Sequence, residues 1–142
     1  MTQRPAFHRA FRRDLAELPA IVAYTDAALA TSALSPAQRQ TVHLAIEELF
    51  TNMVKYAAGG APTIALEVAC VHGGVDVTLI DSGVERFDPR TAPGACTDAP
   101  LPERQPGGLG LLLVRRLVDA LRYDYVAERR EGRTQFRVAG PC

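Results

Sequence analysis

The middle of the chain, residues 42–57, has the hydrophobic pattern of an amphipathic helix. Apolar residues recur at intervals of three and four, which places them on one face at 3.6 residues per turn: Val42, Ile46, Leu49, Phe50, Met53, Val54 and Ala57. Ahead of this segment, Ser35 and Gln38 flank Pro36 as an N-cap and a capping box. Because two glycines follow at positions 59 and 60, we expect one long helix from Pro36 to about residue 58.

The segment before this helix contains an alternating pattern and then a helical one. In residues 6–12, Phe7 and Phe11 fall on the same side, which predicts a short edge strand. Between residues 18 and 30 the apolar residues are spaced as in a helix. Pro19 fits the first turn of that helix, where a missing N–H group costs nothing.

Two pairs of strands are expected after the central helix. Ile64–Cys70 and Val75–Leu79 alternate between apolar and polar residues on either side of a His-Gly-Gly turn, which is a hairpin signal. Tyr123–Glu128 and Thr134–Val138 form a similar pair around a turn at 130–132. The chain therefore closes with a second hairpin.

A proline-rich loop and a third helix separate the two hairpins. Phe87–Pro106 contains half of the ten prolines of the chain and cannot form a regular element. A loop of this length in a compact domain is usually functional or disordered, and we expect it to act as a lid. Gly107–Gly110 then leads into a helical pattern over Leu111–Arg122, with an expected buried face made of Leu111, Val114, Leu117, Val118 and Leu121.

This order of elements predicts an α+β fold. Hairpins join most of the strands, and the strand–helix–strand alternation of a Rossmann fold is missing. We expect a two-layer sandwich with a mainly antiparallel mixed sheet and the helices on one face. The chain, residues 1–142, is expected to be a single domain.

The composition gives no reason to expect a charged partner. Apolar residues make up 47% of the chain, the formal net charge is zero and the pI is about 6.8, so neither nucleic-acid nor membrane binding is expected. Apolar runs are too short to span a bilayer, and the N-terminus lacks the hydrophobic region of a secretory signal. The cysteines, Cys70, Cys96 and Cys142, are odd in number and widely spaced, which fits neither a disulfide framework nor a zinc site. They suggest a reducing compartment, the cytoplasm.

Candidate chemistry lies on the polar side of the central helix. Glu48, Asn52 and Lys55 are four and three residues apart, so their side chains are neighbours, and Tyr56 lies at the edge. A carboxylate, an amide and an amine suit a metal-bound polyphosphate, as a base, a metal ligand and a phosphate contact. The alternative is a solvated face with one weak ion pair. Lys55 is the only lysine among sixteen basic residues, which favours the first interpretation.

Two glycine-containing segments add to this pattern. The glycines at 107–110 open a helix and would expose backbone N–H groups that suit phosphate, although they fit a flexible loop end as well. Asp81 ends a predicted strand two residues before Gly83, and its carboxylate would accept a hydrogen bond from an exocyclic amine such as that of adenine. Alone, these two residues would indicate only a turn. The polar side of the central helix, the Asp81–Gly83 segment and the glycines at 107–110 follow one another in this order, and together they favour a nucleotide site.

Together the motifs resemble those of the gyrase, chaperone and histidine-kinase ATPase superfamily, whose ATP-binding domain is the Bergerat fold. The likeness covers nearly the whole chain. The matching motifs are Glu48-x-x-x-Asn52 for the N-box, Asp81-x-Gly83 for the first glycine box, Gly107-Gly108-Leu109-Gly110-Leu111 for the second and, more weakly, Gly132-Arg133-Thr134. Within the superfamily, the sequence is most similar to the stand-alone anti-sigma-factor serine/threonine kinases.

The resemblance implies roles toward ATP and Mg²⁺. Asp81 would bind the adenine amino group, supported by Thr134 through water, and Gly83 would let the base approach. Asn52 would ligate Mg²⁺, and Glu48 would accept the proton of the attacking hydroxyl group. The other implied nucleotide contacts are Lys55, Tyr56, Gly107, Gly108, Leu109, Gly110 and Leu111. Arg104 would either stabilise charge on the transferred phosphoryl group or be a solvated loop arginine.

The resemblance also implies a function. The protein would be a cytoplasmic kinase that phosphorylates Ser or Thr of a small anti-sigma-factor antagonist. It would thereby regulate a sigma factor or another target by partner switching, and members of the family often form homodimers. Two alternatives stay open: a nucleotide-bound binding module with little or no kinase activity, and a simple ATPase in which Glu48 activates water.

Overall fold

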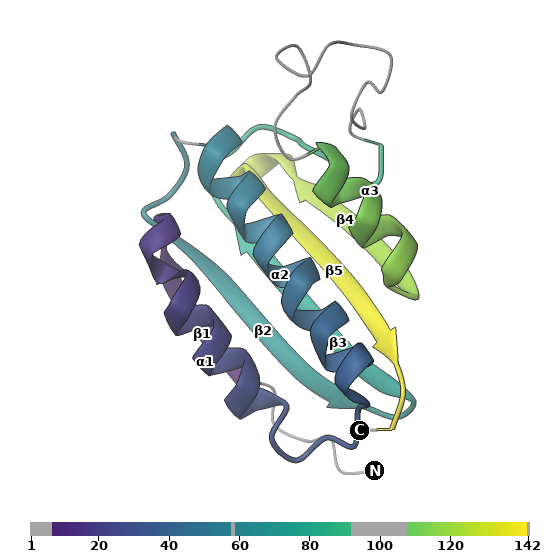
Figure 1. The fold of residues 1–142 in the computed structure, drawn as a ribbon. Coiled ribbons are helices and arrows are strands. Elements are labelled where there is room, and N and C mark those ends of the chain that lie inside the picture. Colours follow the sequence, from purple (N-terminus) through teal and green to yellow (C-terminus); the bar gives the residue numbers. More distant parts are fainter. Residues whose placement is uncertain (1–6, 58, 92–107, 142) are drawn as a thin grey trace.

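Three helices cover one face of a five-stranded sheet (Figure 1). The computed structural model describes residues 7–57, 59–91 and 108–141. The strands are β1 (Phe7–Arg12), β2 (Thr63–Val71), β3 (Gly74–Asp81), β4 (Ala120–Val126) and β5 (Glu131–Ala139). The helices are α1 (Leu18–Ala28), α2 (Pro36–Tyr56) and α3 (Gly108–Leu117), with short 3-10 turns at Leu15–Glu17 and Ala127–Arg129.

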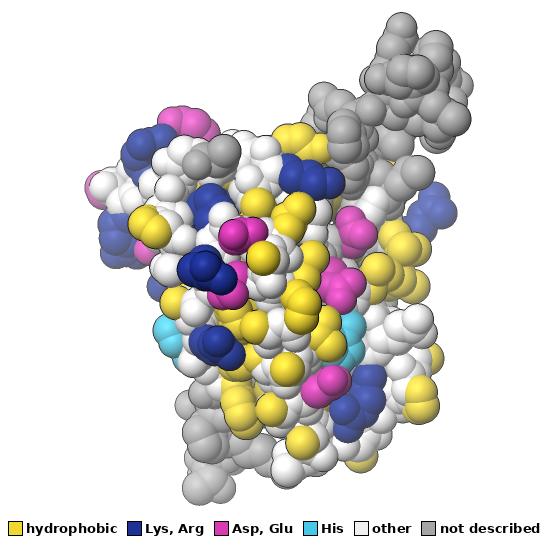
Figure 2. Space-filling model, turned by 60° about the vertical axis from the view of Figure 1, so that its left-hand side comes forward, with side chains coloured by type: hydrophobic (Ala, Val, Ile, Leu, Met, Phe, Trp, Pro, Cys, Tyr) yellow, Lys and Arg dark blue, Asp and Glu magenta, His cyan; other side chains and the backbone are white. Residues whose placement is uncertain are grey.

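The strands lie in the order β1-β2-β3-β5-β4. All four pairings between these described strands are antiparallel, so the expected α+β sandwich is confirmed but its sheet is not mixed. The long helix α2 crosses the middle of the sheet, with α1 on the β1–β2 side and α3 beside β4 (Figure 1). Acidic, basic and hydrophobic side chains are interspersed on the face seen in Figure 2, in keeping with a net charge of zero.

The start of α2 is fixed by the capping box that the sequence predicts. The Gln38 backbone N–H donates to the Ser35 side-chain oxygen at 3.1 Å, and the Ser35 backbone N–H donates to Gln38 Oε1 at 2.7 Å. These two bonds satisfy N–H groups that have no partner inside the helix. The helix ends at Tyr56, close to the expected position.

The core lies between α2 and the covered face of the sheet. One side of α2 is buried there through Val42, Ala45, Ile46, Leu49 and Phe50. Alternate strand residues meet it, with Leu66 of β2 opposite Leu79 of β3 and Val68 opposite Val77. This packing fixes the rotation of α2 about its axis and thereby fixes where its polar residues lie.

The third helix is shorter than the sequence predicts. It ends at Leu117, and residues 120–122 belong to β4 instead. The Asp119 backbone N–H donates to the carbonyl oxygen of Arg137 at 2.9 Å, and β4 then pairs with β5. Pairing across the sheet therefore overrides the helical periodicity of this segment. Leu117, expected in the buried face, is 43% exposed.

The second hairpin is longer than expected, and its turn lies elsewhere. The predicted turn at 130–132 is wrong, because the chain reverses at 127–130 and β5 already begins at Glu131. Arg130 adopts a left-handed conformation with φ of 47°, the only positive φ at a described residue other than glycine. Gly132 is thus a buried strand residue opposite Tyr125.

Several predictions fall outside the described residues, including Arg104, Gly107 and most of the expected lid. Cys70 is disulfide-bonded, whereas Cys96 and Cys142 are not among the described residues. The sequence predicts no disulfide framework, but the disulfide at Cys70 removes the support that the cysteine pattern gave to a reducing compartment. In the described ranges, no helix is both long and apolar enough to cross a membrane.

Candidate functional site

A cavity of about 330 Å³ opens where the C-terminal half of α2 meets the ends of β3 and β5. Its remaining walls come from residues 84–89, α3 and β4. Six of the residues to which the resemblance gives a role toward ATP line it: Asn52, Tyr56, Asp81, Gly83, Leu111 and Thr134. They come from four different parts of the chain, which only the fold brings together.

Asp81 supplies a buried carboxylate to this cavity. It is the last residue of β3, and its side chain is 7% exposed. Burial raises the pKa of Asp81, while a hydrogen bond and the charge of Arg13 act in the opposite direction. Both carboxylate oxygens contact the Arg13 guanidinium group, with Nη1 at 3.4 Å from Oδ2.

Arg13 is a residue that the sequence reasoning missed. It lies 68 positions from Asp81 along the chain, and its neighbours form no motif. Its contact with Asp81 depends on two strands, β1 and β3, that do not pair with one another. A local sequence pattern carries no signal for such a contact.

Asn52 brings to the same cavity an amide nitrogen, Nδ2, that has no hydrogen-bond partner among the described residues. The sequence analysis places it on the polar side of α2 beside Lys55, but only 6% of Asn52 is exposed, whereas Lys55 lies at the surface. A buried polar group without a partner lowers the stability of the fold by roughly 1–3 kcal/mol. Such a group therefore indicates a position where a ligand binds.

The side-chain amide of Asn52 suits either of two ligand groups. Turned one way it offers a donor to a phosphate oxygen, and turned by 180° it offers an oxygen to a cation. An oxygen ligand of this kind fits Mg²⁺, which usually takes few protein ligands and keeps part of its water shell.

Gly83 shapes the loop that follows β3. Its φ of +69° is a conformation that glycine adopts without strain. A Cβ atom at this position would lie 3.2 Å from the backbone nitrogen of Ala61, which donates to the carbonyl oxygen of Ser82 at 2.8 Å. A glycine therefore keeps this side of the cavity open and its backbone within reach of a flat ligand.

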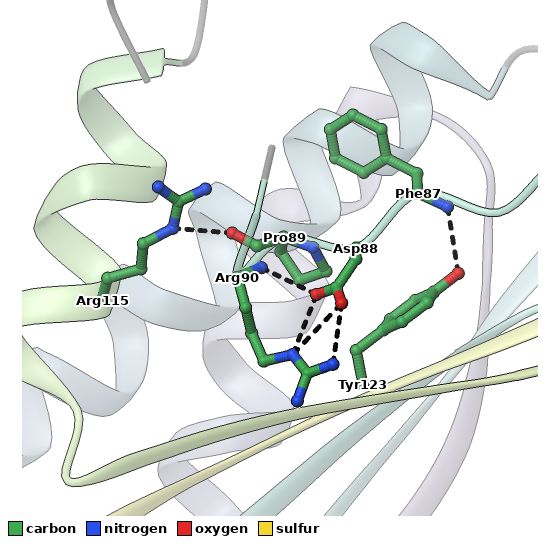
Figure 3. A network of polar contacts seen from close by, with 6 residues as sticks. All are labelled: Phe87, Asp88, Pro89, Arg90, Arg115 and Tyr123. Atoms are coloured by element: carbon green, nitrogen blue, oxygen red, sulfur yellow. Dashed lines mark hydrogen bonds and ion pairs between the residues drawn. The ribbon is translucent and has the colours of Figure 1, made fainter. Parts of the chain in front are cut away.

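A polar network holds residues 87–90 in place, and two of them, Phe87 and Pro89, line the cavity (Figure 3). The backbone N–H of Phe87 donates to the Tyr123 hydroxyl oxygen at 3.0 Å, and Arg115 Nε donates to the carbonyl oxygen of Pro89 at 2.7 Å. Asp88 accepts hydrogen bonds from both the backbone and the side chain of Arg90, which lower the pKa of Asp88. The segment is thus tied to β4 and to α3. Tyr123, which also lines the cavity, was not predicted as a site residue.

Thr134 lies on the cavity floor in β5. It is 2% exposed and sits opposite Leu79 on one side and Tyr123 on the other. Gly132, two residues before it, packs so closely on Tyr123 that a Cβ atom would lie 3.0 Å from the hydroxyl oxygen. The predicted glycine–threonine element therefore faces the same cavity as Asp81.

Glu48 lies against α3 and is not among the residues that line the cavity. Its carboxylate contacts Gly110, where an added Cβ atom would overlap it. The N-box carboxylate and the second glycine box are therefore neighbours. Lys55 likewise does not line the cavity, and Gly108 and Leu109 belong to the first turn of α3.

The arrangement agrees with the comparison to known proteins. The profile of the histidine kinase-like ATPase domain matches residues 11–137. The chain belongs to the histidine kinase-like ATPase family. This membership supports ATP binding and an ATP-using activity, and the N-box and glycine boxes named above fall within the matched range.

A solved structure has a similar fold. It is the crystal structure of the RsbU and RsbW domains of Rv1364c from Mycobacterium tuberculosis, with a TM-score of 0.65 and 18% sequence identity. The match covers 96% of this histidine kinase-like ATPase and 32% of the other chain, so the present chain spans about a third of that length. No protein of curated function matches the sequence.

Proposed function

We propose that this histidine kinase-like ATPase is a serine/threonine protein kinase of the anti-sigma-factor type. The observation that supports it is that one helix, α2, carries both an amide suited to a cation and a carboxylate suited to accept a proton. The Asn52 amide lies in the cavity, and the Glu48 carboxylate lies against α3. The RsbW domain named in the similar structure agrees with this assignment.

In this proposal the cavity binds the nucleotide of Mg-ATP. Asp81 accepts a hydrogen bond from the adenine amino group, Thr134 supports it through water, and Gly83 leaves room for the base. Asn52 holds the cation. The other contacts are those that the family resemblance implies: Lys55, Tyr56, Gly107, Gly108, Leu109, Gly110 and Leu111. When bound, Mg²⁺ neutralises phosphate charge and aligns the triphosphate.

Transfer then requires a proton acceptor and a group that stabilises charge on the transferred phosphoryl. Glu48 accepts the proton of a Ser or Thr hydroxyl as the hydroxyl oxygen bonds to the γ-phosphorus. The bond between that phosphorus and the β,γ-bridging oxygen breaks, and ADP leaves with the electron pair. Arg104 would stabilise charge on the transferred group.

The proposed substrate is a small anti-sigma-factor antagonist protein, and the regulated target is a sigma factor or a similar regulator. The family resemblance, and not the cysteine pattern, is the reason for proposing a cytoplasmic location. The same resemblance suggests a homodimer. A nucleotide-gated binding module is the second candidate. This candidate is favoured by the position of Lys55, the residue implied as a phosphate contact. Lys55 is exposed and lies outside the cavity that holds Asn52 and Asp81.

The test is label transfer from γ-labelled ATP into a lysate of the source cell. Parent protein is compared with Glu48→Gln, and Glu47→Gln serves as a control that makes the same change one position away. A small protein labelled on Ser or Thr by the parent and by Glu47→Gln, but not by Glu48→Gln, would support the kinase. Tight ATP binding by all three proteins without any label would contradict it and favour the binding module.

A further inference from the structure

Arg13 contacts the carboxylate of Asp81 without being among the described residues that line the cavity. Its guanidinium group reaches both oxygens, Nη2 pairing with Oδ1 and Nη1 lying 3.4 Å from Oδ2. Each of the two side chains is only 7% exposed. Asp81 thus faces the cavity while Arg13 supports it from behind.

Arg13 is anchored by groups other than this carboxylate. Its Nε atom donates to the carbonyl oxygen of Ala61 at 2.8 Å, and Nη1 donates to that of Met53 at 3.2 Å. Its backbone N–H donates to Pro62, also at 2.8 Å, and a Cβ atom on Gly60 would overlap the guanidinium group. Because these partners come from the end of α2 and the segment before β2, the guanidinium group is a fixed support and not a mobile gate.

The position of this positive charge affects what Asp81 offers to a ligand. Burial favours the neutral form of the carboxyl group and raises the pKa of Asp81, whereas Arg13 and the backbone N–H of Ser82 favour the ionised form. An ionised carboxylate only accepts hydrogen bonds, but a neutral carboxyl group also donates one. The chemistry of the cavity floor therefore depends on Arg13.

We propose that Arg13 is a positioning residue that keeps Asp81 a pure acceptor and thereby makes the site select a purine with an amino group over one with a carbonyl group. The inference rests on the proposed ATP site and names the residue that sets its base specificity. Arg13 does not touch the base. It acts through the Asp81 carboxylate, whose remaining lone pairs are free to accept from the base.

ATP and inosine triphosphate are a matched pair for this question. ATP carries an amino group at C6 and an unprotonated N1, whereas inosine triphosphate carries a carbonyl oxygen at C6 and a hydrogen on N1. For a base held in the same pose, the C6 group that faces Asp81 changes from a donor to an acceptor. A carboxylate accepts from the amino group and is repelled by the carbonyl oxygen, whereas a neutral carboxyl group can donate to that oxygen. Without the Arg13 charge, discrimination between the two nucleotides falls.

The test measures the dissociation constants of both nucleotides with Mg²⁺ by titration calorimetry. The proteins are the parent, Arg13→Gln, Arg13→Lys and Arg39→Gln. Arg39 is the matched control because it also donates to main-chain carbonyl oxygens, those of Leu29 and Ser32, away from the cavity. We expect the parent and Arg39→Gln to prefer ATP by about tenfold or more, Arg13→Gln to lose most of that preference, and Arg13→Lys to recover it.

The outcomes separate this proposal from the proposed function. If Arg13→Gln keeps the parental ratio of the two constants, the role of Arg13 is refuted and the ATP site stands, whatever the thermal stability of the variant. A parent that binds both nucleotides equally well refutes base selection alone. A parent that binds neither refutes the nucleotide site and this inference together.

A measurement on the unaltered protein covers the case in which Arg13→Gln does not fold. NMR spectra follow the Arg13 guanidinium protons and the Asp81 carboxyl carbon with and without Mg-ATP. The proposal expects an ionised carboxyl carbon and protected guanidinium protons in both states. Loss of the guanidinium signals on ATP binding would show that the nucleotide displaces Arg13, and would overturn the proposal.

Discussion

The Glu48 carboxylate lies against Gly110, so that α2 and α3 touch where the N-box meets the second glycine box. A Cβ atom at position 110 would overlap the end of this flexible side chain. The space that glycine leaves is thus occupied by the group proposed to accept the proton. Stability and transfer activity should therefore respond differently to a change at this position.

We expect Gly110→Ala to fold with unchanged or slightly higher stability but to lose at least about tenfold in phosphoryl transfer. Alanine favours a helix by up to about 1 kcal/mol over glycine, while the displaced carboxylate leaves its proposed working position. Urea unfolding and the label-transfer assay check the two effects. Gly59→Ala, whose Cβ atom would meet nothing within 4 Å, is the control. Equal transfer by the parent and Gly110→Ala would argue against Glu48 as the base.

Asn52→Leu should raise the free energy of unfolding by about 1 kcal/mol and abolish ATP binding. Leucine is similar in size and removes the buried Nδ2 atom that has no partner in the described structure. The measurement is thermal unfolding with and without Mg-ATP. A variant that is less stable than the parent, or that keeps the ATP-dependent increase in melting temperature, would contradict this assignment.

Asp81→Asn should reduce stability as well as ATP binding. The variant would leave the Arg13 charge buried without its partner. Breaking a buried ion pair costs about 3–5 kcal/mol. Urea unfolding of Asp81→Asn, Arg13→Met and the double variant should reveal coupling of at least about 1 kcal/mol. Additive effects would mean that the pair does not contribute in solution.

Tyr24 should lose its phenolic proton at a higher pH than an ordinary tyrosine does. Burial raises the pKa of Tyr24 to about 12, and its hydroxyl group donates to the carbonyl oxygen of Leu66 at 3.1 Å. Because the folded pKa lies above the unfolded value of 10.0, the resulting stability is complete below pH 10 and is lost as the pH rises toward 12. Ultraviolet titration of the phenolates should show a late component that Tyr24→Phe lacks. An identical titration of both proteins would exclude it.

Local rules predicted much of the fold. The capping box at Ser35, the first hairpin and the edge position of β1 depend on contacts between residues near in sequence or on simple alternation. The end of α3 did not follow from its own periodicity. Residues 120–122 pair with β5, and that pairing stabilises the fold more than a longer helix would.

The candidate site was predicted from motifs only in part. Asn52, Asp81, Gly83 and Thr134 do line one cavity. The burial of Asn52 was not predicted, because a helical wheel does not show which other parts of the chain pack on a given side of α2. Arg13 and Tyr123 were missed since neither belongs to a motif, and the contacts that tie them to the site join residues far apart in the sequence.

The position of Arg13 directly after β1 has a consequence for the length of chain that this domain needs. β1 is an outer strand that pairs only with β2 in the described sheet, and such strands are often regarded as dispensable. A truncated form that begins at Asp14 would lose this strand together with the counter-charge of Asp81. The other four strands would still form one continuous sheet, yet the cavity would contain a buried acid without its counter-charge.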